Sequence, residues 1–453
     1  MKEKFRLSVL AFSLALLTFG GCDINARHHA YVDTFAGQLG QAWTTGAQFT
    51  GHISEVFFDR PQALAIDGTG QLLVSDHRRV RRIIIQGGPA AGGHAVGTVL
   101  PFIPPGGNGE PSPFIAGAVR GMAIDSQGNV ILSDHAGQRV QKFDMQGNHL
   151  RTFGAGGGND PSNMHIDGPG HIAQFHGPAG IAVDSSDNIF VVDTWNNRIR
   201  KITVNTGTTL ISGVDPGFVS TFAGSIKSYA EGRGPWAFFQ EPVGLAIDSN
   251  DVLIVADTWN HLIRYITPQG DTGVYASFKD SWGFRDGEAS IARVRLPQFL
   301  FFDNDTENLY FTDSDIHAIR VVTRGVRLPV PPPPYGAAHY RGYRDWTISN
   351  NRIRPRACNQ HCTAVCQPYC GFDCTEPNCF CFRQSYVVSG RLVQTVAGFT
   401  GISHRDNNFI GRGHRDGPGD LAMFSSPRGI AVTRAGTIFV ADFDNHVIRR
   451  ITR

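Results

Sequence analysis

The sequence has almost no net charge and lacks the common catalytic motifs. Its 41 lysine and arginine residues stand against 39 aspartate and glutamate residues, which leaves a formal charge of +2. Nucleic acids and anionic membranes are bound mainly through clustered positive charge, so this balance argues against either as a direct partner. No G-x-S-x-G elbow, H-E-x-x-H pair, Walker loop or G-x-G-x-x-G turn occurs. The sequence therefore contains no motif that identifies an enzyme.

Long apolar runs are absent after the N-terminus, so no later segment is expected to span a bilayer. The opening MKEKFRLSVLAFSLALLTFGGC combines a basic start, an apolar run and small residues, which is typical of a secretory signal. Phe19-Gly20-Gly21-Cys22 resembles a bacterial lipobox, which implies lipidation of Cys22 and an exported lipoprotein. Cleavage after Ala26 is the alternative. We expect residues 1–26 to be a signal region and the protein to be lipid-anchored in the cell envelope or secreted.

Cysteine is scarce outside one segment. Seven of the eight cysteines lie in residues 325–390, which are rich in proline and polar residues: Cys358, Cys362, Cys366, Cys370, Cys374, Cys379 and Cys381. A segment of this composition cannot build its own hydrophobic core, so we expect a cap held by disulfides, whose pairing the sequence does not give. The number is odd, and five of the cysteines are spaced by four residues, so a metal cluster remains the alternative.

What the sequence does contain is one phrase repeated six times. VVDTWNNRIRKI at 191–202 returns as VADTWNHLIRYI at 255–266, and four other segments share its aspartate. The six aspartates are Asp76, Asp134, Asp193, Asp257, Asp313 and Asp442. A phrase such as PAGIAVD precedes each copy, and a further short segment follows most copies. Short β-branched segments bounded by turn residues predict four antiparallel strands per copy, which is the blade of a β-propeller.

The spacing of these aspartates predicts a closed ring of six blades. Successive aspartates are 58, 59, 64, 56 and 129 residues apart, and the last interval falls to 63 when the 66 residues of 325–390 are set aside. We therefore expect an insert in blade five. The chain ends after a third strand, and residues 31–37 have the form of the missing fourth, so we expect this N-terminal strand to close the ring. Residues 31–324 and 391–453 then form the propeller.

Two charged positions recur with the blades. Arginine stands seven residues after the aspartate in four of them: Arg200, Arg264, Arg320 and Arg449. We interpret these arginines as solvated strand faces or interblade pairs rather than an RNA-binding surface. We interpret the aspartates as caps for the backbone N–H groups of their own turns. A second acidic residue, followed by glycine, precedes four blades: Asp167, Glu231, Asp286 and Asp416.

The repeats resemble NHL repeats, named for an Asn-His-Leu phrase that stands here as Asn260-His261-Leu262. The resemblance covers nearly all of the chain from residue 31, apart from the insert. It implies an all-β, six-bladed propeller. Propellers of this kind include lyases, lactonases and modules that bind peptides, proteins or RNA, so the fold alone does not give the function.

One candidate site is aromatic. Trp195 and Trp259 hold the same position in adjacent blades, where flat rings suit contacts with a peptide or a sugar, and Phe443 and Tyr229 would extend the patch. The alternative is that each tryptophan only packs on its neighbouring blade.

The other candidate site is a metal centre. His77 and His135 each directly follow a turn aspartate in adjacent blades, and His176 or His261 would supply a third ligand for a divalent metal. The resemblance supports this possibility, since six-bladed amidating lyases hold zinc with histidines around the central channel. Solvent-exposed turn histidines are the alternative.

Two functions follow from these sites. The first is a non-enzymatic platform in the envelope or outside the cell that binds a protein, peptide or glycan through the tryptophans. The second is a metal-assisted lyase or lactonase with its site at the central channel. The absence of catalytic motifs favours the first.

Overall fold

The computed structural model describes residues 30–39, 50–87, 95–103, 114–156, 165–204, 217–279, 282–324, 391–398 and 412–453. They belong to one compact unit, which spans Arg27–Arg327 and Val388–Arg453. This part of the chain consists of strands, turns and short 3-10 segments, and none of its helices is long and apolar enough to cross a membrane. The predicted all-β class is confirmed.

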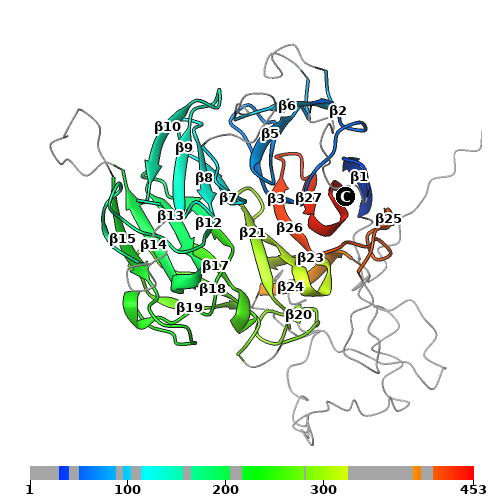
Figure 1. Ribbon diagram of the computed structural model, residues 1–453. Coiled ribbons are helices and arrows are strands. Elements are labelled where there is room, and N and C mark those ends of the chain that lie inside the picture. The colour runs from blue at the N-terminus through cyan, green and yellow to red at the C-terminus, as the bar shows by residue number, and fades with distance from the viewer. Residues whose placement is uncertain are drawn as a thin grey trace, which may run out of the picture. The chain divides into compact units, whose positions relative to one another are not determined.

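Six antiparallel sheets are arranged as the blades of a propeller (Figure 1). The innermost strands are β3 (Pro61–Ile66), β7 (Val119–Ile124), β12 (Pro178–Val183), β16 (Leu245–Ile247), β21 (Pro297–Asp303) and β26 (Pro427–Val432). Each inner strand contacts the inner strand of the next blade, and β26 contacts β3. The six blades predicted from the aspartate spacing are therefore present.

The remaining strands follow outward in chain order. The second strands are β4 (Leu72–Asp76), β8 (Val130–Asp134), β13 (Ile189–Asp193), β17 (Leu253–Asp257), β22 (Asn308–Asp313) and β27 (Ile438–Asp442). The third strands are β5 (Arg79–Ile83), β9 (Arg139–Phe143), β14 (Arg198–Thr203), β18 (Leu262–Ile266), β23 (Ala318–Arg324) and β28 (Val447–Thr452). The outer strands are β6 (Thr98–Pro101), β10 (His149–Phe153), β15 (Phe218–Ala223), β19 (Thr272–Ala276), β24 (Arg391–Ala397) and β1 (Tyr31–Ala36). Each aspartate of the repeated phrase thus ends a second strand.

Four outer strands carry one more short pairing partner. These partners are β2 (Gly51–His52), β11 (Gly168–Pro169), β20 (Gly287–Glu288) and β25 (Gly417–Pro418). In blade six the outer strand comes from the other end of the chain, because β1 pairs with β28 and places Val32 opposite Ile451. In blade five β23 pairs directly with β24, although residues 325–390 separate them in the sequence. Those residues, with their seven cysteines, lie outside the described residues, as does Cys22.

The hydrophobic core lies between neighbouring blades. One buried cluster joins Ile131 of β8 to Ile181 of β12 and Val191 of β13. Similar clusters pack the other blades together, and most residues of the second strands are fully buried. Burying both faces of the blades explains why these strands are rich in valine and isoleucine, whose branched side chains suit a pleated, packed surface.

Glycines set the close approach of the inner strands. A Cβ on Gly121 would lie 2.2 Å from the carbonyl oxygen of Ala179, and one on Gly429 would lie 2.2 Å from that of Gln62. Gly180 and Gly244 meet the next blade in the same way. At this level the central channel has room for only about 40 Å³, little more than one water molecule. A ligand must therefore bind at an end of the channel rather than inside it.

Candidate functional site

Fully buried arginines hold together the strands and the incoming segment within single blades. Arg200 donates through Nη1 to Oδ2 of Asp193 (2.8 Å) and through Nη2 to Oδ1 of Asp167 (2.6 Å). Arg320 and Arg449 make the same two contacts with the acids of their own blades. The prediction that these arginines are solvated or link blades is wrong. A buried guanidinium with two carboxylates is a structural ion pair, and it explains the Asp-Gly phrase that precedes these blades.

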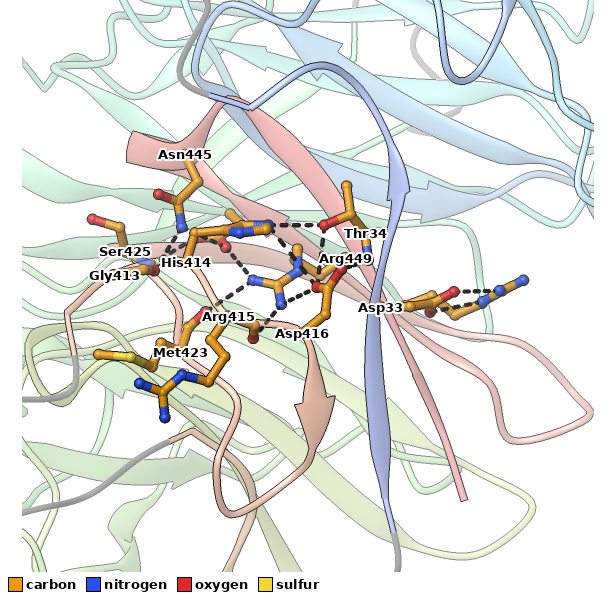
Figure 2. A network of polar contacts seen from close by, with 12 residues as sticks. Asp33, Thr34, Gly413, His414, Arg415, Asp416, Met423, Ser425, Asn445 and Arg449 are labelled. Atoms are coloured by element: carbon orange, nitrogen blue, oxygen red, sulfur yellow. Dashed lines mark hydrogen bonds and ion pairs between the residues drawn. The ribbon is translucent and has the colours of Figure 1, made fainter.

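Figure 2 shows the arrangement around Arg449 in blade six. Asp416 accepts a hydrogen bond from Arg449 and also from the backbone N–H (3.1 Å) and hydroxyl (3.2 Å) of Thr34 in β1. Asp33 of the same strand pairs with Arg450. Polar side chains therefore join the N-terminal strand to the last blade in addition to the backbone ladder.

The turn aspartates also hold the segment that leads into each blade. Oδ1 of Asp193 accepts the N–H of His176 (2.6 Å), which lies 17 residues upstream. The same contact recurs at Asp257 and Asp442. The aspartates have a structural role, but the prediction that they cap their own turns is wrong in most blades, because most of the N–H groups they accept belong to the incoming segment.

Each turn ends in a residue with left-handed backbone, and in four of the six turns the side chain of this residue binds the next blade. These four residues are Asn197, His261, His317 and His446, with φ between 55° and 61°. Their side chains accept a backbone N–H of the following blade at 2.8, 3.2, 3.0 and 3.2 Å respectively. We call these four contacts the interblade latches. The histidine of the Asn-His-Leu phrase is thus a structural residue.

The two histidines proposed as metal ligands do not hold equivalent positions. His77 has φ of 52° and occupies the left-handed turn position, with its ring 3.5 Å from Asp59. His135 instead follows its aspartate directly, and Nδ1 lies 3.1 Å from the carbonyl oxygen of Pro178. The first repeat is shorter by two residues, which explains why alignment on the aspartate alone paired them. The described residues contain no group of three or more histidine, cysteine, aspartate or glutamate side chains that fits a metal ion.

His135 is buried against Trp195, with their ring centroids 4.7 Å apart. His176 packs on the same tryptophan at 4.7 Å. Burial and the nearby Arg120 lower the pKa of His135 to about 4, so the ring is neutral at pH 7. Thr258 and Ser314, which hold the same turn position in other blades, also bond the carbonyl of the next strand-opening proline. His135 therefore serves as a link between blades.

A cavity of about 230 Å³ opens at the end of the channel on the side of the DTWNN turns. We call it the mouth cavity. It is lined chiefly by Trp195 and Trp259, Arg120 and Arg428, and Glu241 and Gln298. The structure thus brings together the two tryptophans singled out in the sequence, on adjacent blades and in one cavity.

Both tryptophans keep about half of their surface exposed, 47% for Trp195 and 52% for Trp259. Trp195 is supported by Gly177, where a Cβ would lie 2.8 Å from the indole. The positive φ of Gly177, 66°, also suits glycine. The ring of Trp195 is therefore held in place, and about half of the surface of both tryptophans remains open to a ligand.

The other two aromatic residues of the predicted patch do not line this cavity. Phe443 lies behind Arg428, whose guanidinium carbon is 3.4 Å from the ring centroid. Tyr229 donates to Glu231 (2.9 Å) and packs on the buried Arg264. Burial and Glu231 raise the pKa of Tyr229 to about 12. Phe443 supports the mouth cavity indirectly, whereas Tyr229 belongs to the framework of blade four.

Sequence reasoning missed the arginines of the mouth cavity. Arg120 and Arg428 both stand directly before an inner-strand glycine. Other blades have glutamine, alanine or valine at this position, so the signal was a basic residue in two of six copies. This signal is weak because the position lies within the apolar phrase that marks the inner strand.

The fold and its repeats define a six-bladed β-propeller that contains NHL repeats. The sequence profile of the NHL repeat matches residues 175–202, 239–264 and 424–451, which lie in blades three, four and six. Protein SUPPRESSOR OF QUENCHING 1, chloroplastic, from Arabidopsis thaliana is 27% identical over 296 residues, which are 63% of this chain and 26% of that protein. Human NHL repeat-containing protein 2 is 26% identical over 185 residues, 39% of this chain and 24% of that protein. The aligned region spans about a quarter of each relative.

Solved structures show the same fold. An auxiliary nutrient binding protein from Bacteroides ovatus superposes with a TM-score of 0.54 over 94% of this chain and 76% of that chain, at 15% identity. A protein of unknown function from Bacteroides thetaiotaomicron gives the same TM-score over 93% of this chain and 76% of that chain, also at 15% identity. At this identity the likeness concerns the fold alone.

Proposed function

We propose that this protein is a non-enzymatic binding protein whose ligand site is the mouth cavity. The observation that carries this proposal is the pair of half-exposed tryptophans, which adjacent blades present to one cavity on a rigid ring. Large aromatic surfaces held open in a concave site are typical of peptide and sugar recognition. The mouth cavity has room for one ring or one side chain of a ligand, because about 230 Å³ lies below the volume of most drug-sized pockets.

The location of the protein is part of this proposal. We infer export from the N-terminal signal pattern, with lipidation of Cys22 or secretion after cleavage as its two forms. Pairing of β1 with β28 would then close the ring just after the signal region. We further propose that the cysteines of residues 325–390 form disulfides in the exported protein. A binding role is also consistent with the description of the Bacteroides ovatus protein of the same fold as an auxiliary nutrient binding protein.

The alternative is a metal-assisted lyase or lactonase. It requires histidines that converge on one ion, but His77 and His135 hold different positions in their turns. No observation among the described residues favours this reaction over binding.

The proposal is tested by probing peptide and glycan arrays with the mature protein. The test variant carries Trp195→Ala and Trp259→Ala, and the matched control is Trp236→Ala, which removes a more exposed indole (76%) outside the mouth cavity. We expect wild type and control to share their bound ligands and the double variant to lose them. Binding that survives in the double variant, or no specific ligand for wild type, would contradict the proposal.

A further inference from the structure

The two arginines of the mouth cavity are held rigidly on opposite sides of blade one. Arg120 belongs to β7 of blade two, and Arg428 to β26 of blade six. Each precedes a glycine that lies against the backbone of the next blade, so neither strand can shift. Arg428 is further fixed by a hydrogen bond from Nη1 to Oε1 of Gln62 (2.9 Å) and by the ring of Phe443.

These arginines differ from the others of the inner propeller because they have no acidic partner. No carboxylate of the described residues lies within 4.0 Å of the guanidinium of Arg120 or Arg428, whereas Arg200, Arg320 and Arg449 each pair with two. The Nε atoms of Arg120 and Arg428 are buried without a hydrogen-bond partner among the described residues, as are those of Arg200, Arg320 and Arg449, so only the missing ion pair sets the two apart. Asp444 acts on Arg428 only from beyond ion-pair distance. Half-buried guanidinium groups without a directly paired carboxylate are costly, and an incoming anion would relieve that cost.

Arg120 and Arg428 carry their positive charges at neutral pH. Burial and the neighbouring Arg120 lower the pKa of Arg428 to about 10, so its guanidinium remains protonated at pH 7. Burial also lowers the pKa of Arg120. Two positive charges that repel each other at one end of the channel produce a local positive potential, although the whole chain is nearly neutral.

The rest of the mouth cavity wall is aromatic. Trp195 and Trp259 come from blades three and four, where blade three adjoins blade two of Arg120 and lies across the ring from blade six of Arg428. Glu241 lies on this side, where it pairs with Lys227. A ligand in this cavity would thus meet the positive charge of the two arginines together with the indole rings and the carboxylate of Glu241.

From this arrangement we propose that the mouth cavity selects small ring-shaped organic anions, with the anionic group at Arg120 and Arg428 and the ring on Trp195 and Trp259. Guanidinium groups bind carboxylates in the plane of both groups, and indoles stack on the faces of sugar or aromatic rings. The carboxylate of Glu241 disfavours a second anionic group at the aromatic end. The inference rests on the proposed function and adds the chemical class of the ligand.

The test is calorimetric titration of the full-length protein with two acids and their neutral counterparts: D-glucuronate against D-glucose, and phenylacetate against 2-phenylethanol. We expect at least one acid to bind at least tenfold more tightly than its neutral counterpart, with affinity that falls as salt increases. Arg120→Met and Arg428→Met should each weaken that acid by tenfold or more. Arg428→Lys, which keeps the charge, should weaken binding of that acid less than Arg428→Met does. Thermal unfolding would verify that each variant is folded.

The outcomes separate this inference from the proposed function. Equal binding of acid and neutral partner that still depends on Trp195 would overturn the charge selection and leave the binding site in place. Binding that depends on neither the arginines nor the tryptophans would overturn both. If no acid binds wild type, the anion inference is wrong, whereas the array experiment still decides the proposed function.

Discussion

The interblade latch at His317 gives a prediction about stability, and the corresponding latch of another blade shows which substitution should be tolerated. Nδ1 of His317 accepts the backbone N–H of Ser426 at 3.0 Å and so ties blade five to blade six. Blade three makes the corresponding latch with Asn197, which accepts the N–H of Glu241 at 2.8 Å. Asparagine at 317 should therefore preserve the contact, while residues without an acceptor should not.

The magnitude follows from two contributions. Loss of the acceptor leaves the N–H of Ser426 unsatisfied in a partly buried position, which costs about 1–3 kcal/mol. The left-handed backbone of His317, with φ of 56°, adds roughly 1 kcal/mol for an aliphatic side chain but little for asparagine or glycine. We expect His317→Asn to change the free energy of unfolding by less than about 0.5 kcal/mol, His317→Gly to lower it by about 1–2 kcal/mol, and His317→Leu by about 2–4 kcal/mol.

Denaturant unfolding followed by tryptophan fluorescence measures these differences, and hydrogen exchange of the Ser426 amide locates them. Exchange at Ser426 should be slow in wild type and His317→Asn and faster in His317→Gly and His317→Leu. If the asparagine and leucine variants were equally stable, with equal exchange at Ser426, the latch would not contribute as described.

The remaining predictions concern buried charge, pH and metal. Arg200→Met should lower the free energy of unfolding by about 3–5 kcal/mol, because it leaves two carboxylates without their cation. The control is Arg198→Met, on the same strand but more exposed, which should lower the free energy of unfolding by less than about 1 kcal/mol in the same denaturant titration. The pKa of His135 is about 4 in the folded protein and about 6.5 in the unfolded chain. Its contribution to the free energy of unfolding is therefore intact above pH 6.5 and falls by about 3 kcal/mol as the pH is lowered toward 4. In denaturant titrations across this pH range, the stability of His135→Gln should fall less than that of wild type. Equal acid sensitivity of the two proteins would refute this assignment. Elemental mass spectrometry should find the same metal content in wild type and His135→Gln, and metal lost only from the variant would revive the enzyme alternative.

The blades could be predicted because each one repeats the same signals. The turn aspartates, the strand-opening prolines and the β-branched segments recur with a regular period, and six copies made the period visible. The same regularity led to an error at Arg200. An alternating strand such as NRIRKI suggests that every arginine faces water. The second arginine, Arg200, is instead buried, because its guanidinium forms ion pairs with Asp167 and Asp193. The available signal was the spacing of these three residues, which is seven residues from the turn aspartate to the arginine and 33 or 34 from the second acid to the arginine.

The site was only half predictable, for a physical reason. Trp195 and Trp259 could be found because they share one position in adjacent repeats. Arg120 and Arg428 come from blades two and six, and only the closed ring brings them to the same cavity. Their lack of an acidic partner is a property of the fold and cannot be read from the charge of the chain.

The most direct test of the mouth cavity as the ligand site is identification of small molecules that remain bound to the purified protein, by mass spectrometry after denaturation. Wild type and the Trp236→Ala control should carry the same ring-containing acid, and the Trp195→Ala, Trp259→Ala variant should lack it. The same molecules in equal amounts on all three proteins would contradict the assignment of the mouth cavity as the binding site.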